Sequence, residues 1–160
     1  MATTGNKVIY SICSRKGYVN IMAIKQLSVF VENKPGKLLD IVKMLADAQI
    51  NIRAMSIADT KDFGILRLIV SDTEKAKEIL SEDCVVTVTS VIAAEMSDKA
   101  GALSTVLTAF GNAGINIEYM YAFTASTQLG AYVVIRVDDN DAAEKVLHDN
   151  GIATLDNAAI

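Results

Sequence analysis

The sequence contains the same short phrase twice. The stretch "AQINIRAM", around Asn51, returns as "AGINIEYM" around Asn116. The alignment extends back without a gap and also matches Gly36 with Gly101, so that both pairs are 65 positions apart. A constant offset over a segment of this length indicates an internal duplication. The chain is therefore predicted to fold as two copies of one module.

Hydrophobic periodicity predicts the same elements in both copies. Alternating apolar residues in "LSVFV" predict a strand, and the next segment has the i, i+3, i+4, i+7 spacing of an amphipathic helix. The helical stripe comprises Leu38, Ile41, Val42 and Leu45 in the first copy and Leu103, Val106, Leu107 and Phe110 in the second. Two strands joined by turn residues follow, and then a second helix and a closing strand.

The start of each second helix is predicted from its capping residues. Ser71 and Glu74 have the spacing of a capping box, in which both side chains satisfy free backbone amides at the helix start. Asp141 and Glu144 repeat that spacing in the second copy. Both second helices are therefore expected to begin at these residues.

The element order of each copy is strand, helix, strand, strand, helix, strand. This order predicts an α+β fold of two ferredoxin-like βαββαβ modules side by side, with helices on one face of an antiparallel sheet. The modules are predicted at 22–89 and 90–155, with a tail at 156–160, while residues 1–21 form a leader or extension of unknown role. No polar linker separates the modules, which favours rigid packing between them.

Composition and residue types exclude several classes of protein. A 51% hydrophobic composition can supply a buried core, while a net charge of −4 argues against a nucleic-acid-binding surface. Cys13 and Cys84 stand far apart and His148 is the only histidine, so the sequence predicts no metal, no cofactor and no catalytic set. No apolar run reaches the roughly 18 residues of a membrane span, and the protein is expected to be cytoplasmic.

The best candidate for a binding site is the loop "ENKPGKL" between the first predicted strand and helix. Pro35 fixes the backbone there, and Gly36 allows a tight turn into the helix. Unpaired amides in the first helical turn and the helix dipole favour a carboxylate or another anion at this point. The alternative is that Gly36 only makes the tight turn.

This loop, the amphipathic helix and the following "AQINIRAM" resemble the signature of an ACT domain, and the combination occurs twice over about residues 24–155. The resemblance implies one eight-stranded sheet, with small ligands held where the first loop of one module meets the second strand of the other. It also implies a stand-alone, non-catalytic amino-acid sensor that acts on a regulated enzyme or another partner. Open sheet edges favour a homodimer.

The resemblance also assigns ligand-binding residues by position, in the first loop and at the start of the second strand of each copy. The predicted set is Asn33, Lys34, Pro35, Gly36, Lys37, Leu38, Asn51, Ile52, Asp98, Gly101, Ala102, Leu103, Asn116 and Ile117. The second copy departs from the motif, because Asp98 stands at the position of Asn33 and Ala100 at the position of Pro35.

This departure predicts two unequal sites. An amide can donate to a carboxylate and accept from an ammonium, whereas an ionised Asp only accepts. We expect Asn33 and the Gly36 amide, facing Asn116, to form the better amino-acid site. Asp98 with Asn51 would suit an ammonium end. Hydrogen-bonded turn capping is the alternative role for both asparagines.

Two other functions share the predicted topology. An acylphosphatase needs an arginine in its anion-binding loop, and "ENKPGKL" has none. An RNA-binding module would combine aromatic and basic residues on its central strands. Tyr119, Tyr121 and Phe123 share one face of a predicted strand, but the chain is acidic. Packing in a core or interface is therefore the better interpretation of these aromatic residues.

Opposite charges distinguish the two repeated phrases, with Arg53 in the first and Glu118 in the second. Equivalent strand positions in paired modules can lie close together, which makes these side chains candidates for an ion pair. Two separately solvated charges are the equal alternative.

Overall fold

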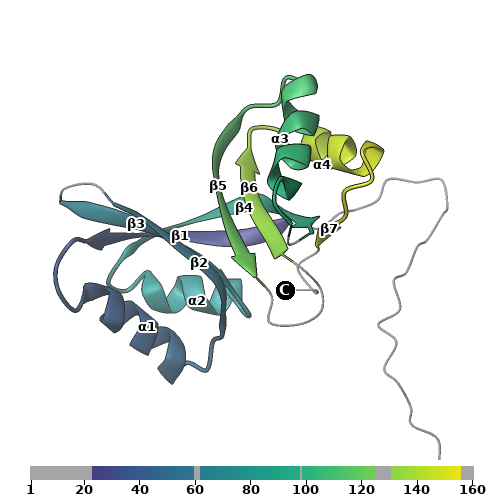
Figure 1. Ribbon diagram of the computed structural model, residues 1–160. Coiled ribbons are helices and arrows are strands. Elements are labelled where there is room, and N and C mark those ends of the chain that lie inside the picture. The colour runs from purple at the N-terminus through teal and green to yellow at the C-terminus, as the bar shows by residue number, and fades with distance from the viewer. Residues whose placement is uncertain (1–22, 60–61, 98, 125–130, 156–160) are drawn as a thin grey trace, which may run out of the picture.

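The computed structural model describes residues 23–59, 62–97, 99–124 and 131–155. Both halves repeat the predicted element order, and the predicted α+β fold of two ferredoxin-like modules is confirmed (Figure 1). The elements are β1 (Ile24–Glu32), α1 (Lys37–Asp47), β2 (Ile52–Asp59), β3 (Phe63–Val70), α2 (Thr73–Leu80), β4 (Val85–Met96), α3 (Ala102–Asn112), β5 (Ile117–Thr124), β6 (Ala131–Val137), α4 (Asn140–Asp149) and β7 (Thr154–Leu155).

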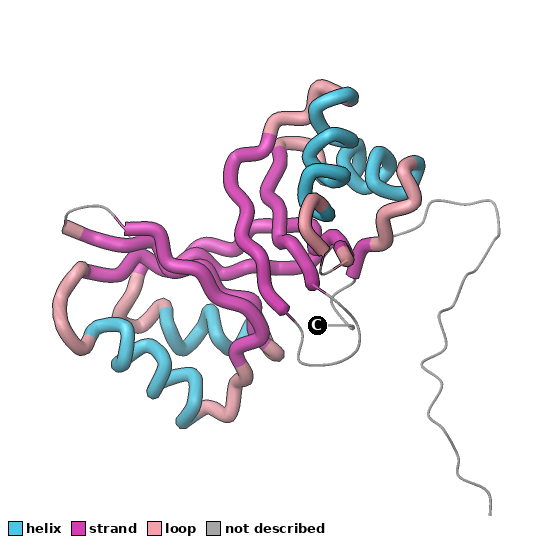
Figure 2. The backbone as a smooth tube through the Cα atoms, viewed as in Figure 1, coloured by secondary structure: helices cyan, strands magenta, loops and turns pink. Residues whose placement is uncertain are grey.

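A single long strand, β4, belongs to both modules. Residues 85–91 of β4 pair with β1, and residues 92–96 pair with β6 and, in part, with β7. Every pairing is antiparallel, and the strand order is β2-β3-β1-β4-β6-β5 with β7 beside β4. Within the described residues the sheet has seven strands rather than the expected eight, because the closing strand of the first module and the opening strand of the second are one element (Figure 2).

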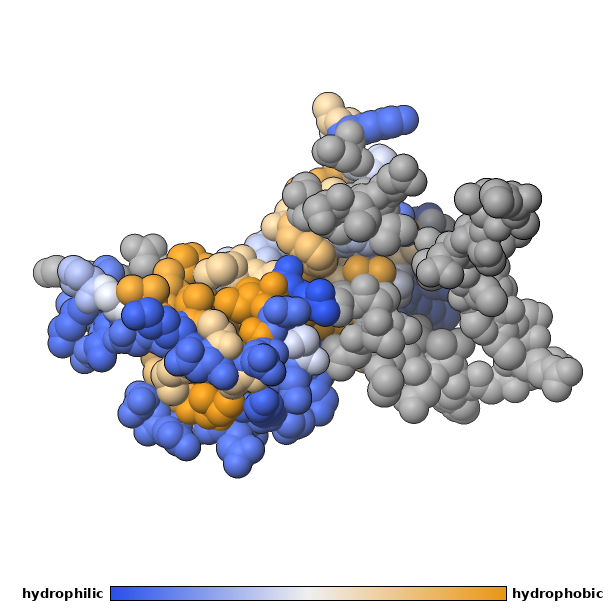
Figure 3. All heavy atoms as spheres, turned by 90° about the horizontal axis from the view of Figure 1, so that it is seen from below, coloured by the Kyte–Doolittle hydropathy of each residue, from blue (hydrophilic) through white to orange (hydrophobic). Residues whose placement is uncertain are grey.

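Each module buries one face of its sheet beneath its own two helices. The core of the first module includes Leu27, Val29, Ile41, Leu45, Leu66, Leu68 and Leu80. The core of the second includes Ile92, Val106, Phe110, Val133, Ile135 and Leu147. Both helical stripes predicted from the sequence contribute to these cores. From the side that carries α1 and α2, the left and lower margins of the first module are mostly hydrophilic, and apolar residues show along its upper part (Figure 3).

The predicted caps of the second helices are wrong by one or two residues. The carboxylate of Asp72, not Ser71, accepts from the Lys75 N–H at 3.0 Å at the start of α2. Asp139 caps α4 in the same way, accepting from Ala142 N–H at 3.0 Å. The Ser71 hydroxyl has another partner, the backbone N–H of Asn51 just before β2, so the next residue with a short carboxylate caps the helix.

The faces of the two half-sheets that carry no helix pack against each other. Their shared core contains Ile24, Ala54, Ile69, Val91, Ala93 and Val134, with Tyr121, Phe123 and Leu155 beside it. The second module stands over one end of the first, and β5 crosses in front of β1 in this view (Figure 1). We call this contact the module junction.

Candidate functional site

The first helix of each module begins at a glycine in the left-handed region. Gly36 precedes α1 with φ 90°, and Gly101 precedes α3 with φ 89°. A residue with a Cβ is strained in this conformation, which explains a glycine at both positions. Glycine has no side chain that could cap the helix, so the first-turn amides that make no backbone hydrogen bond keep their capacity to bind a ligand. The tight turn predicted at Gly36 is present.

The loops before these helices are held by the same backbone hydrogen bonds. The N–H of Lys34 donates to the Glu32 carbonyl at 2.8 Å, and that of Lys99 donates to the Ser97 carbonyl at 2.8 Å. The first amide of α1 donates back to Lys34 at 3.3 Å, and that of α3 donates back to Lys99 at 3.1 Å. The duplication therefore reproduces the backbone of the predicted site, not only its sequence.

A cleft opens beside each of these helix starts. The first has a volume of about 550 Å³ and lies between α1, the end of β1 and the turn before β4. The second, of about 260 Å³, lies at the equivalent place between α3, the end of β4 and the turn before β7. The first cleft is lined by Glu32, Lys37, Asp40, Lys43, Asp47, Asp83 and Cys84 among others. The second is lined by Ser97, Ala102, Thr105, Gly151 and Ala153 among others.

The Cys84 thiol at the first cleft is not activated as a nucleophile. Burial, together with nearby Asp83, raises the pKa of Cys84 above its ordinary value, so the thiol stays protonated at neutral pH. The side chain of His148 on α4 is 90% exposed. Across the described ranges, no group of three or more His, Cys, Asp or Glu side chains is placed to hold a metal ion. None of the described helices is long and apolar enough to cross a membrane.

The predicted asparagines stand exposed at the strand starts, Asn51 before β2 and Asn116 before β5. The Asn51 N–H donates to the Ser71 hydroxyl at 3.0 Å, and its carbonyl accepts from the Ser71 N–H at 2.9 Å. Ile52 and Ile117, which follow the asparagines, pack partly buried against the two cores. Their contacts are those of core residues.

Within one chain, the loop of one module does not meet the strand start of the other. The helix α1 begins at the outer end of the first module, whereas β5 begins beside the end of α3, at the far end of the second (Figure 1). Asp98, which was expected to share a binding site with Asn51, lies outside the described residues. The loop and the strand start lie apart because β4 is continuous. It brings the helix-free faces together and leaves β2 and β5 at the ends of the strand order.

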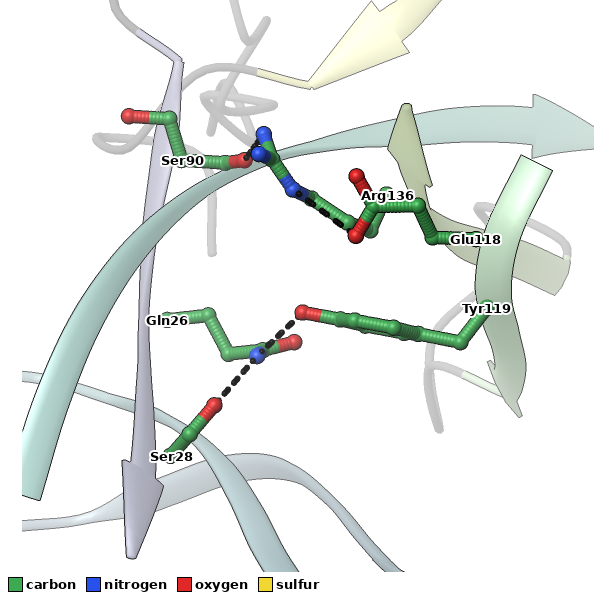
Figure 4. Close-up of polar contacts among 6 residues, drawn as sticks. All are labelled: Gln26, Ser28, Ser90, Glu118, Tyr119 and Arg136. Carbon is green, nitrogen blue, oxygen red and sulfur yellow. Dashed lines mark hydrogen bonds and ion pairs between the residues drawn. The ribbon is translucent and has the colours of Figure 1, made fainter. Parts of the chain in front are cut away.

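The module junction contains a polar cluster centred on Gln26 of β1, which is fully buried. Its amide nitrogen donates to the Tyr119 hydroxyl at 2.8 Å and to the Ser28 hydroxyl at 3.2 Å (Figure 4). Its amide oxygen accepts from the Tyr121 hydroxyl at 2.9 Å. Burial raises the pKa of Tyr121 far above its ordinary value, which keeps this hydroxyl a donor. Sequence reasoning missed Gln26, although a glutamine inside an apolar strand was a visible signal.

Aromatic residues of β5 complete the junction. The Arg67 guanidinium carbon lies 4.0 Å from the centre of the Tyr119 ring, a cation–π contact. Among the residues that the structure describes, its buried Nε has no hydrogen-bond partner. Phe123 stacks on Tyr132 with ring centres 5.5 Å apart. The predicted packing role of these aromatic residues is confirmed, and they are not displayed as an RNA-stacking surface.

The suggested pairing of Arg53 with Glu118 is wrong. The Glu118 carboxylate lies 3.6 Å from Nε of Arg136, on the neighbouring strand β6, while Arg53 is exposed on β2. Arg136 also donates to the Ser90 carbonyl at 3.2 Å (Figure 4). The equivalent strands β2 and β5 do not face each other across the junction. Glu118 pairs instead with Arg136 of its own module.

Fold and site geometry together define a protein made of two duplicated βαββαβ modules, each with a glycine-started helix beside a cleft, joined through a shared strand. The sequence model of the family described as the ACT domain pair matches residues 22–159, and the chain belongs to this family.

Similar proteins connect the chain with aspartokinases. The aspartokinase of Corynebacterium glutamicum is 28% identical over 136 residues, which cover 74% of this chain but only 31% of that relative. The solved structure of protein BT0572 from Bacteroides thetaiotaomicron is 40% identical, with a TM-score of 0.80 over 86% of this chain and 95% of that one. The regulatory subunit of aspartate kinase from Thermus thermophilus shares the fold, with a TM-score of 0.60 at 16% identity over 83% and 95% of the two chains.

Proposed function

We propose that this protein is a non-catalytic sensor that binds a small amino acid and signals its presence to a metabolic enzyme. The observation that carries the proposal is the duplicated helix start, in which Gly36 and Gly101 have the same left-handed conformation. The first amide of each helix donates to its loop, and the first-turn amides left without such a bond favour the carboxylate that all amino acids share. Membership in the ACT domain pair family and the partial identity to an aspartokinase support a regulatory role.

The ligand is proposed to lie between the helix-start loop of one module and the asparagine-led strand start of another. Since these parts lie apart within one chain, a second copy of the chain would supply the missing half. The strands β2 and β5 end the sheet and can pair with another copy. Exposed Met55 and Ile57 on β2 suit such a contact. The proposed sensor is thus a cytoplasmic homodimer.

The two kinds of site are proposed to be unequal. A loop with Asn33 can recognise both ends of an amino acid, whereas a loop with Asp98 repels the carboxylate end. The clefts beside the loops differ in the same sense, because charged side chains line the first and small, mostly uncharged ones line the second. We assign the tighter amino-acid binding to the loop with Asn33.

Signalling requires that the ligand favours one arrangement of the modules over another. The shared strand β4 and the Gln26 cluster tie the modules together, so a ligand that moves one module also moves the other. An enzyme of amino-acid metabolism bound to the second module would sense that displacement. We propose such an enzyme as the partner.

A thermal-shift screen against the twenty amino acids tests the proposal. A ligand at 100 times its dissociation constant stabilises by about 2.7 kcal/mol, which corresponds to a rise of roughly 5–10 °C in Tm. Calorimetry with the best ligand then compares Asn33→Ala, Asp98→Ala and a control, Glu78→Ala, on the exposed face of α2. We expect at least about tenfold weaker binding for Asn33→Ala only. No shift with any amino acid contradicts the sensor, and equal losses for Asn33→Ala and Asp98→Ala contradict unequal sites.

A further inference from the structure

The helix-free face of the first module is only partly covered by the second. The module junction covers the end of this face around Ile24 and Ile69. The same face continues to the other ends of β1, β3 and β4, where it carries Phe30, Phe63 and Val85. These residues are 41%, 44% and 67% exposed, and they are three of the eight exposed large hydrophobic residues in the described part of the chain.

The three residues form one apolar patch, which we call the face patch. Phe30 pairs directly with Val85 across β1 and β4, and its ring centre lies 6.4 Å from that of Phe63. Ile65, half-buried, stands opposite Phe30 on β3 and extends the patch along that strand from Phe63. The side chains of β1 on either side of Phe30 in sequence point towards the helices. No helix of the same module can therefore cover the face patch.

We infer that the face patch is a contact surface for a second copy of this chain. The adjoining part of this face is already buried, and the surface that buries it is the helix-free sheet face of the second module. We therefore expect another sheet face to cover the face patch. In the second module that face is occupied by the junction. The sheet face that a second chain has free is its own face patch, and two-fold symmetry brings one face patch onto the other.

The charge distribution fits a contact between identical surfaces. Of the ionisable side chains beside the face patch, Glu32 pairs with Lys34 at 3.1 Å and Arg67 lies against Tyr119. The side chains of the face patch itself carry no charge, so two copies can approach without setting like charges directly against each other. A contiguous apolar patch rimmed by polar residues is typical of protein interaction surfaces.

This inference goes beyond the edge-paired site of the proposed function. Edge pairing through β2 extends the sheet sideways, whereas the face patch stacks one sheet on another, so each contact is disrupted by its own substitutions. The test is made without ligand, which separates the two proposals.

Sedimentation equilibrium of the full chain, from micromolar to millimolar concentration, measures dimerisation. Phe30→Asp and Val85→Asp each place a charge in the face patch, and Leu39→Asp is the matched control, since Leu39 is 55% exposed on α1. We expect the two patch variants to raise the dimer dissociation constant at least about 30-fold and the control less than about threefold. Thermal unfolding of every variant checks the fold, and Val85→Asp, at the first residue of β4, keeps the test valid if Phe30→Asp does not fold.

Three outcomes overturn the inference. The first is a wild-type chain that stays monomeric at every concentration, and the second is equal sensitivity to Val85→Asp and Leu39→Asp. The third is a dimer that tolerates both patch variants but dissociates with Ile57→Lys on β2; this result leaves the proposed edge-paired ligand site intact. Patch-dependent dimerisation in a chain that binds no amino acid supports the inference and contradicts the proposed function.

Discussion

The two modules have the same backbone at the helix start but different chemistry beside it. The glycines that begin α1 and α3 differ by one degree in φ, and the same backbone bonds hold both loops. Yet the first cleft has about twice the volume of the second, and charged residues surround it. The duplication shows which features the fold demands, since these recur in both copies. Features that differ are where the two modules can have separate roles.

The strongest way to challenge this comparison is to damage one core and observe the other. Leu45 and Phe110 occupy equivalent positions in the repeat, and both are buried. We expect Leu45→Ala to cost about 2–5 kcal/mol and Phe110→Ala about 3–5 kcal/mol. Because β4 belongs to both modules, each substitution should lower the Tm of one cooperative transition. Calorimetry that resolves two transitions, one unchanged, would show that the modules unfold independently.

The next prediction concerns the junction that makes the two modules one unit. Gln26→Leu leaves the partly buried hydroxyls of Tyr119 and Tyr121 without their partner, at an expected cost of about 1–3 kcal/mol. In a double-mutant cycle with Tyr121→Phe, measured by urea unfolding, the two effects should not add. The control cycle combines Gln26→Leu with Lys77→Ala, a remote exposed position, and should be additive. Additivity in both cycles would show that Gln26 does not couple the two modules.

The fold was largely predictable because its signals are local and occur twice. Periodicity indicated both helical stripes, and Gly36 and Gly101 marked the turns that the structure contains. The module junction was not predictable, because it depends on how β4 continues from one module to the next, and no local pattern determines that path. Gln26 and Arg67 acquire their partners only through this long-range contact. For the same reason, the sequence did not reveal that the loops and strand starts stand apart within one chain.

A smaller effect tests whether the two helix starts are equivalent in backbone. Gly36→Ala and Gly101→Ala each place a Cβ in the left-handed region, at an expected cost of about 1 kcal/mol or slightly more. The added Cβ meets no atom within 4 Å at either position, so the two costs should agree. Chemical denaturation measures both. A difference well above 1 kcal/mol would contradict the equivalence, while equal stability with unequal ligand affinity would support unequal sites.

The smallest effect compares the same position of the two second helices. Glu144 and Lys77 both stand five residues after the capping aspartate, but Glu144 is buried and Lys77 exposed. Burial, and secondarily nearby Asp141, raises the pKa of Glu144 above its ordinary value. The folded state therefore binds this proton more tightly than the unfolded state does. Its contribution to stability is present below the ordinary carboxyl pKa and is lost as the pH rises through the folded value.

Removing this carboxyl group should therefore stabilise the protein, and only where Glu144 would be ionised. We expect Glu144→Gln to raise the Tm by about 1–3 °C at pH 7, with a small size because partial hydration and solvent screen the charge. At pH 3 Glu144 is protonated in both states, so the difference from wild type should disappear. Lys77→Gln, in the exposed setting, should leave the Tm nearly unchanged at both pH values. A rise in Tm for Glu144→Gln that persists at pH 3 would show that packing, and not the charge of Glu144, causes the effect. The two helix positions would then differ in packing alone.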